Sequence, residues 1–143
     1  MCLVTSAELT VAAINDMVEA QFPGSSGRCL EIGDGFAVAF VDVADTNIRP
    51  GGFVSGPTQF ALADMALWFL AFVALGRIEP MALTSELSIR YLRPAQGARL
   101  VCRAELEAVN RRSVVGTCHV WVDGAPERVT AAAQGTYAVP LPR

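Results

Sequence analysis

The chain has 143 residues, of which 52% are hydrophobic and only 17% are charged. This length suits a single domain with its own core, and the composition is too apolar for a disordered protein. The formal net charge of −3 argues against a nucleic-acid-binding domain, which would normally be basic.

All 11 basic residues are arginine, and the absence of lysine excludes Schiff-base chemistry. The one histidine and the four scattered cysteines include no pair at the spacing of metal ligands, such as CxxC or HxxxH, so we expect no metal site. The start of the sequence lacks the features of an export signal, and the dispersed cysteines are typical of reduced thiols. We therefore expect a cytoplasmic protein.

The first part of the sequence predicts a helix followed by a β-hairpin. Thr5-Ser6-Ala7-Glu8 has the spacing of a capping box, and apolar residues follow at helical spacing, so we place the helix at about 5–21. The hairpin covers residues 28–43, with its turn at Gly33-Asp34-Gly35. We assign residues 1–143 to one domain.

A long apolar helix is predicted from the Ser55-Gly56-Pro57 corner to Leu75, with Ser55 as its N-cap. Residues 60–75 are apolar apart from Asp64. A membrane span needs about 20 such residues, and this segment is shorter and carries a charge. We therefore expect a buried core helix and no membrane association.

The second half of the sequence alternates between apolar and polar residues, which predicts strands at 83–91, 99–107, 114–122 and 127–139. The links between them are short, so we expect each strand to pair antiparallel with the next. Each strand has one apolar face, which the apolar helix should cover. The predicted fold class is α+β.

This order of elements resembles the hotdog fold, in which a curved antiparallel sheet wraps around a long helix, and the details resemble the PaaI-type acyl-CoA thioesterases. The likeness rests on Asn47, Ser55-Gly56-Pro57, Ala61-Leu62-Ala63-Asp64, the segment from Thr84 to Ala95 and a closing strand at Ala131–Thr136. It implies an acyl-CoA substrate, no cofactor beyond the coenzyme A of that substrate, and a homodimer or a dimer of dimers.

The loop before the helix departs from the family pattern. The family usually has His-Gly-Gly where this sequence has Ser55-Gly56-Pro57, so Pro57 removes one backbone N–H. Gly56 matches the family glycine whose N–H donates to the oxyanion. Arg49 takes the place of the family asparagine, and Asn47 comes two residues earlier.

Asp64 is the only ionisable residue between Arg49 and Arg77. Because an unpaired buried carboxylate costs several kcal/mol, we expect it to have a partner or a catalytic role. The resemblance implies a carboxylate that attacks the thioester carbonyl or activates water. A solvent-facing or capping aspartate is the structural alternative. Gly56, at the positive end of the helix, either stabilises the oxyanion or serves only a tight corner.

Further residues are expected to bind substrate. By resemblance, a polar residue lies beside the reactive centre at Thr84 or Ser85. From Arg90 to Arg112 there are six arginines and two glutamates, and this excess of positive charge suits the phosphates of coenzyme A. The best candidates are the two arginines of the turn at the end of this range, Arg111 and Arg112. Solvated strand arginines are the alternative. The full set of expected substrate-binding residues is Asn47, Ser55, Pro57, Thr84, Ser85, Arg111 and Arg112.

The leading hypothesis is therefore an acyl-CoA thioesterase. Because of Pro57 and the missing loop histidine, a hotdog protein that binds acyl-CoA or another apolar ligand without turnover is the alternative. A hydratase is disfavoured, because such enzymes pair a histidine with an acid and His119 lies in the wrong part of the chain.

Overall fold

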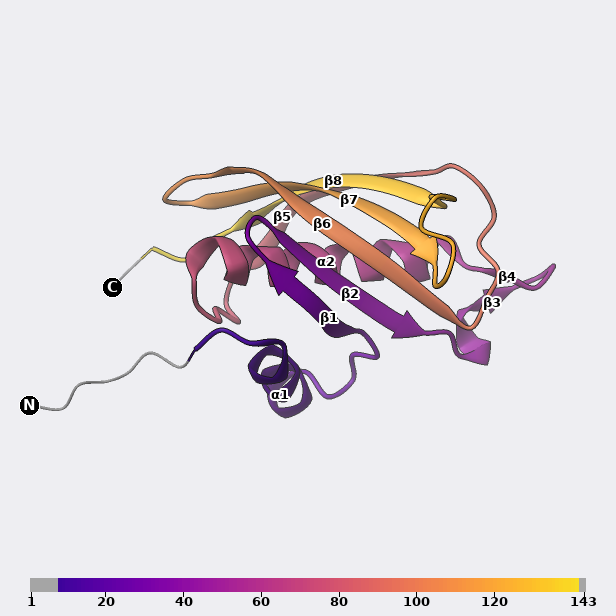
Figure 1. Cartoon of the computed structure of the whole chain (residues 1–143), viewed down its shortest axis with the longest axis horizontal. Helices are drawn as coiled ribbons and strands as arrows, with labels where there is room; N and C mark the ends of the chain where they lie inside the picture. The colour runs from indigo at the N-terminus through magenta and orange to yellow at the C-terminus, as the bar shows by residue number, and fades with distance from the viewer. Residues whose placement is uncertain (1–7, 142–143) are drawn as a thin grey trace, which may run out of the picture.

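The computed structural model of the chain describes residues 8–141. Figure 1 shows one long helix lying along a curved sheet, with a short helix beside the edge of that sheet. In chain order the elements are α1 (Val11–Gln21), β1 (Arg28–Gly33), β2 (Phe36–Asp42), the 3₁₀ turn η1 (Asp45–Asn47), β3 (Ile48–Arg49), β4 (Phe53–Val54), α2 (Gly56–Leu75), β5 (Leu83–Tyr91), β6 (Arg99–Val109), β7 (Ser113–Val122) and β8 (Ala131–Ala138).

The first helix starts later than the sequence predicted. The side chain of Thr10 accepts a hydrogen bond from the Ala13 N–H at 3.0 Å, so Thr10 is the N-cap and α1 begins at Val11. The prediction was therefore wrong for residues 8–10, which are not helical. The expected capping residues Thr5 and Ser6 lie outside the described residues.

The main sheet is antiparallel, with the strand order β1-β2-β6-β7-β8-β5. The predicted pairing of consecutive strands holds for β6–β7–β8 but is wrong for β5, which pairs with β8. The link after β5 does not turn back on itself. Instead this link crosses the end of the sheet, where the Ala95 carbonyl accepts a hydrogen bond from the Val54 N–H of β4 at 2.8 Å.

The last strand is shorter than predicted. Residues 125–128 form a turn in which Arg128 N–H donates to the Ala125 carbonyl at 3.0 Å, so β8 begins at Ala131 rather than near residue 127. The hairpin of β1 and β2 is confirmed, as is the helix capped by Ser55.

The core lies between α2 and the concave face of the sheet. Gly116 and Gly135 face each other on β7 and β8. A Cβ atom at Gly116 would lie 2.5 Å from a methyl group of Leu70, and one at Gly135 would lie 2.9 Å from a methyl group of Leu67. These two glycines therefore let the helix approach the sheet closely, so the large side chains of α2 can be fully buried.

Of the helices in residues 8–141, α2 has the length and apolarity of a membrane span, with a mean hydropathy of 1.7 over its most apolar 18 residues. However, 56% of that window is buried inside the fold. Its apolarity is accounted for by its place in the core, as the sequence predicted.

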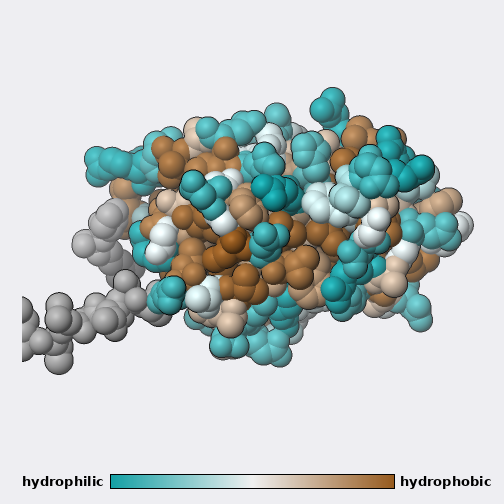
Figure 2. Space-filling view, in the orientation of Figure 1, coloured by the Kyte–Doolittle hydropathy of each residue, from teal (hydrophilic) through white to brown (hydrophobic). Residues whose placement is uncertain are grey.

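The convex face of the sheet accounts for two of the clustered arginines. Arg99 and Arg103 of β6 lie over the rings of Phe40 and Phe36, at 4.3 and 4.0 Å from the ring centroids. Figure 2 shows hydrophobic residues gathered over the middle of the sheet with hydrophilic residues around them. These two arginines thus cover apolar surface and are not free for a ligand in this arrangement.

Candidate active site on helix α2

The carboxylate of Asp64 lies half-buried in the middle of α2, where two strands meet it. Thr84 of β5 donates a hydrogen bond from Oγ1 to Asp64 Oδ1 at 2.6 Å, and Tyr137 of β8 donates from its hydroxyl to the same oxygen at 2.7 Å. Thr84 and Tyr137 are direct cross-strand neighbours. Asp64 therefore has partners from the sheet, as its position in the sequence required.

Asp64, Thr84 and Tyr137 lie on the wall of a cavity of about 540 Å³. The rest of the lining is largely apolar, and no other charged side chain from residues 8–141 contributes to it: Gln21, Phe22, Ser25, Ala61, Met65, Trp68, Pro80, Met81, Ala82 and Leu83. A carboxylate on the wall of an apolar cavity is suited to act on a substrate that carries an apolar group.

The first turn of α2 leaves a single free backbone N–H. Ser55 Oγ accepts from Thr58 N–H at 3.3 Å, and the Ser55 carbonyl accepts from Gln59 N–H at 3.3 Å. Pro57 has no N–H, and Gly56 N–H makes no hydrogen bond within the described part of the chain. Gly56 is thus the available donor at the positive end of the helix.

Tyr91 fixes the backbone at this corner. Its hydroxyl, at the end of β5, donates to the Gly56 carbonyl at 2.8 Å. A Cβ atom at position 56 would lie 3.1 Å from the Tyr91 ring and hydroxyl, so the close approach favours glycine. The preference for glycine here is therefore steric, since the backbone N–H is present in any residue except proline.

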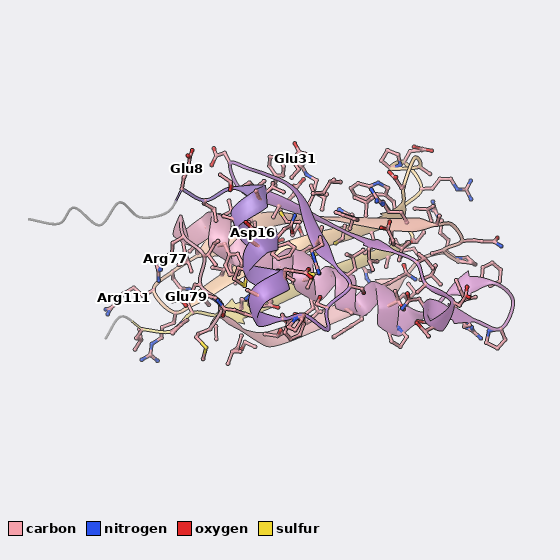
Figure 3. All side chains as sticks on the ribbon, turned by 90° about the horizontal axis from the view of Figure 1, so that it is seen from below. Glu8, Asp16, Glu31, Arg77, Glu79 and Arg111 are labelled. Carbon is pink, nitrogen blue, oxygen red and sulfur yellow. The ribbon has the colours of Figure 1, made fainter. Side chains whose placement is uncertain are left out.

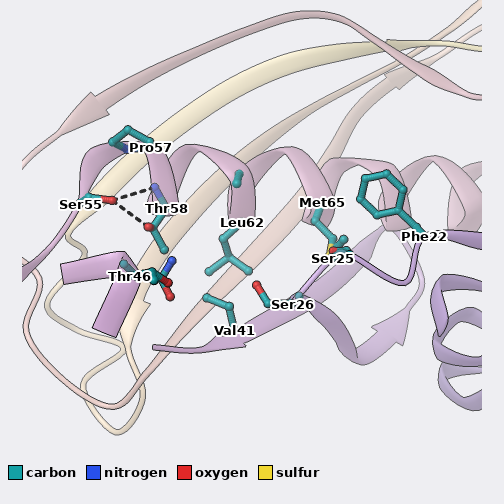
Figure 4. Close-up of a pocket in the computed structure, with 14 residues that line it drawn as sticks. Phe22, Ser25, Ser26, Val41, Thr46, Ser55, Pro57, Thr58, Leu62 and Met65 are labelled. Atoms are coloured by element: carbon teal, nitrogen blue, oxygen red, sulfur yellow. Dashed lines mark hydrogen bonds between the residues drawn. The ribbon is translucent and has the colours of Figure 1, made fainter. Parts of the chain in front are cut away.

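The loop residues predicted to bind substrate lie together on a second cavity, of about 450 Å³. It is lined by Asn47, Ser55 and Pro57, and Figure 4 shows Ser55 hydrogen-bonded to Thr58 at its edge. The Asn47 side chain also has a structural role, because its Oδ1 accepts from Ala44 N–H at 2.9 Å. Both cavities share Phe22, Ser25, Ala61 and Met65, so they lie next to each other along α2.

Ser85, Arg111 and Arg112 line neither of these two cavities. Ser85 occupies the irregularity in the pairing of β5 with β8, between Thr84 and Glu86, and makes no hydrogen bond to Asp64. Arg111 and Arg112 lie in the turn between β6 and β7. Figure 3 shows Arg111 near Arg77, which follows the C-terminal end of α2, whereas Gly56 begins that helix.

Gly56 and Asp64 are also apart within the chain. Eight residues of helix separate them by about 12 Å along the axis. A carbonyl group with its oxygen on Gly56 N–H cannot have its carbon at the Asp64 carboxylate of the same helix.

Sequence reasoning missed Tyr91 and Tyr137. The partners of Tyr137 lie 73 positions earlier in the chain, at Asp64, and no local motif connects them. One feature of the sequence could have indicated the role of Tyr137. The inward-facing residues of β8 are Ala131, Ala133, Gly135 and Tyr137, and a single tyrosine at the end of a stripe of small residues needs a buried partner for its hydroxyl.

Comparisons with known proteins identify the family of this chain. Residues 51–128 match the thioesterase superfamily, a range that contains α2 and strands β5 to β7. A protein from Silicibacter sp. TM1040 that is named as a thioesterase is 30% identical, with a TM-score of 0.79 over 98% of this chain and 95% of that chain. No curated protein matches the sequence significantly.

Two more distant structures share the fold. The thioesterase HI1161 from Haemophilus influenzae is 15% identical, with a TM-score of 0.81 over 97% of this chain and 96% of that chain. A mutant of the phenylacetic acid degradation protein PaaI from Thermus thermophilus is 22% identical, with a TM-score of 0.68 over 87% and 99%. The architecture is the hotdog fold of a thioester hydrolase. The chain belongs to the thioesterase superfamily.

Proposed function

We propose that this protein hydrolyses acyl-CoA thioesters to a carboxylic acid and free coenzyme A. The observation that carries the proposal is the position of Asp64: a carboxylate held by two hydroxyl groups on the wall of a largely apolar cavity. The cavity fits an acyl group, and the carboxylate supplies the one reactive side chain that hydrolysis requires.

Asp64 has two chemical routes to the same products. As a general base it takes a proton from water, whose oxygen attacks the thioester carbon. As a nucleophile it attacks that carbon itself, and water then cleaves the resulting anhydride. In both routes the C–S bond breaks and the thiolate of coenzyme A leaves with a proton. The free Gly56 N–H supports an oxyanion-stabilising role, because it donates from the positive end of α2.

The separation of Gly56 from Asp64 supports a site built from two chains. Strand β5 forms an edge of the main sheet, where it has no second neighbour among residues 8–141. Exposed apolar side chains lie at or next to its ends: Met81, Leu83, Tyr91 and Leu92. Phe60 and Ala61 are exposed on α2. We therefore propose a homodimer that pairs the β5 edges and brings Gly56 of one chain to Asp64 of the other, alone or within a dimer of dimers.

Coenzyme A carries phosphates that require basic partners. Arg111 and Arg112 remain our candidates from the sequence, since both are exposed and neither forms an ion pair within the described residues. Arg49 and Arg93 are a second pair. They line a cavity of about 680 Å³ that also contains Gly56, and no acidic residue lines it.

The alternative function is acyl-CoA binding without turnover. It is favoured by Pro57, which leaves the first turn of α2 with one free N–H where the family pattern offers two. A weak oxyanion site would bind a thioester and hydrolyse it slowly.

Incubation of the purified protein with a panel of acyl-CoAs and a thiol reagent separates the two functions. The panel should include short, medium, long and aromatic acyl groups. Release of free coenzyme A at a rate that is proportional to enzyme and saturable in substrate is expected for at least one of them. Saturable binding of the same thioesters without release of thiol would instead establish the binding protein.

A further inference from the structure

The two oxygens of the Asp64 carboxylate are in different environments. Oδ1 accepts hydrogen bonds from Thr84 at 2.6 Å and from Tyr137 at 2.7 Å. Oδ2 accepts none from residues 8–141, and Asp64 is open to the cavity. We propose that Tyr137 is a positioning residue for hydrolysis: with Thr84 it immobilises Oδ1 and leaves Oδ2 as the oxygen that reacts. This inference rests on the role proposed for Asp64.

Tyr137 is well placed to hold Asp64. It is 5% exposed, and its hydroxyl lies 2.7 Å from Oδ1 and also 2.9 Å from the main-chain carbonyl oxygen of Asp64. The phenol therefore contacts both the side chain and the backbone of the same helical residue. A carboxylate with two donors on one oxygen cannot rotate freely about its last bond, so the direction of Oδ2 is fixed relative to the sheet.

The hydroxyl of Tyr137 keeps the proton that it donates to Asp64. Burial, with a contribution from the Asp64 carboxylate, raises the pKa of the phenol above its usual range, so the O–H group is retained at working pH. Tyr137 is thus neutral, and no cation lines the cavity among residues 8–141. Within residues 8–141, the hydrogen bonds to the Asp64 carboxylate therefore come from these two hydroxyl groups.

Tyr137→Phe removes the hydroxyl and keeps the ring. Because a hydrogen bond to a charged group is lost, kcat should fall by about 10- to 100-fold. KM should change by less than about twofold, since the hydroxyl contacts Asp64 rather than the substrate. Thr84→Val should likewise lower kcat with little change in KM, because it removes the second donor to Oδ1. Thr84→Ser, which keeps the donor, should retain the wild-type kcat.

Thr130→Val is the matched structural control. Thr130 is 3% exposed and donates from its hydroxyl to Gln59 of α2 at 2.8 Å, without contacting Asp64. Its loss should lower the unfolding temperature and leave kcat unchanged. If Tyr137→Phe behaves like Thr130→Val, with a lower unfolding temperature and wild-type kcat, the hydroxyl is structural and the inference is overturned.

Asp64→Asn separates this inference from the proposed function. If Asp64→Asn remains active, the role of Asp64 fails, and the inference fails with it. If Asp64→Asn is inactive while Tyr137→Phe has wild-type kcat, only the role of Tyr137 is wrong. Should Tyr137→Phe not fold, Thr84→Val at its exposed strand position tests the same oxygen, and an unchanged kcat there overturns the inference.

Discussion

The side-chain amide of Asn15 forms both hydrogen bonds that a neighbouring strand would offer to Cys29. Its Nδ2 donates to the Cys29 carbonyl at 3.0 Å, and its Oδ1 accepts from the Cys29 N–H at 2.8 Å. Cys29 lies on β1, at one edge of the main sheet. Helix α1 therefore satisfies that edge near the start of β1, whereas β5 at the opposite edge has no such cover from residues 8–141.

Asn15→Ala should weaken the attachment of α1. Two backbone groups of Cys29 lose their partners, so the free energy of unfolding should fall by about 1–3 kcal/mol. Urea unfolding measures this change. Asp16→Ala on the exposed side of α1 is the control, since Asp16 forms no hydrogen bond within the described residues, and it should change stability by less than about 0.5 kcal/mol. Equal effects of the two substitutions would contradict the role of Asn15.

The thiol beneath this contact predicts alkaline instability. Burial raises the pKa of Cys29 to about 12 from an ordinary value of 9.0. The unfolded chain releases this proton first, so the stabilisation is present below pH 9 and is lost as pH rises toward 12. In that window Cys29 should lower the free energy of unfolding by up to about 1.4 kcal/mol per pH unit. Urea unfolding at pH 8 and pH 10.5 measures how much free energy of unfolding is lost between the two pH values. This loss should be smaller for Cys29→Ala than for the wild type, and an identical loss would contradict the prediction.

Much of the fold follows from local patterns, because α2 and the strands differ in hydrophobic period and Ser55 is a strong N-cap. Asp64 could be selected because it is an isolated charge in an apolar segment. The partner of β5 could not be predicted, since a short link favours a hairpin and only tertiary packing replaces it with β8. Tyr137 was missed for the same reason: its contact with Asp64 exists only after two strands and a helix have assembled.

Asp64→Asn should lower kcat by at least ~10²-fold, because the amide is neither a base nor a nucleophile of comparable strength. The fold should be kept, since an amide oxygen still accepts the hydrogen bonds of Thr84 and Tyr137. Steady-state hydrolysis and thermal unfolding measure the two effects. Asp34→Asn, in the turn between β1 and β2, is a control of the same chemistry away from the cavity. Near wild-type turnover by Asp64→Asn would exclude the proposed role.

The arginines that bind the phosphates of coenzyme A can be identified with two double variants. Loss of a charge-assisted phosphate contact costs roughly 1.5–3 kcal/mol, which should raise KM by about 10- to 100-fold. We expect this for Arg111→Ala with Arg112→Ala. The same assay on Arg49→Ala with Arg93→Ala tests the arginines of the cavity near Gly56. An N-acetylcysteamine thioester has no phosphate, so its hydrolysis should barely change, and equal losses on both substrates would exclude a role in phosphate recognition.

The donor role of Gly56 can be isolated from its steric role. Ser55 has φ −67° and ψ 153°, which is compatible with a following proline, and proline is tolerated at the first position of a helix. Gly56→Pro therefore removes the N–H without straining Ser55, and the constraint that Pro57 places on a residue with a Cβ atom at position 56 is shared by Gly56→Ala. Gly56→Ala is the matched control, because it adds the same Cβ atom near Tyr91 and keeps the N–H. Gly56→Pro should lose at least about tenfold more kcat than Gly56→Ala.

Mixed dimers test whether Gly56 and Asp64 act across two chains. An Asp64→Ala chain and a Gly56→Pro chain are each inactive alone if both residues are needed. In a mixed dimer with shared sites, one site contains both defects and the other contains neither. Co-refolding should therefore restore activity to about half of the wild-type value per mixed dimer, since one of its two sites is intact. Mixed dimers verified by two affinity tags but without activity would show that each site lies within one chain, and the distance of about 12 Å along α2 would then exclude joint action of Gly56 and Asp64.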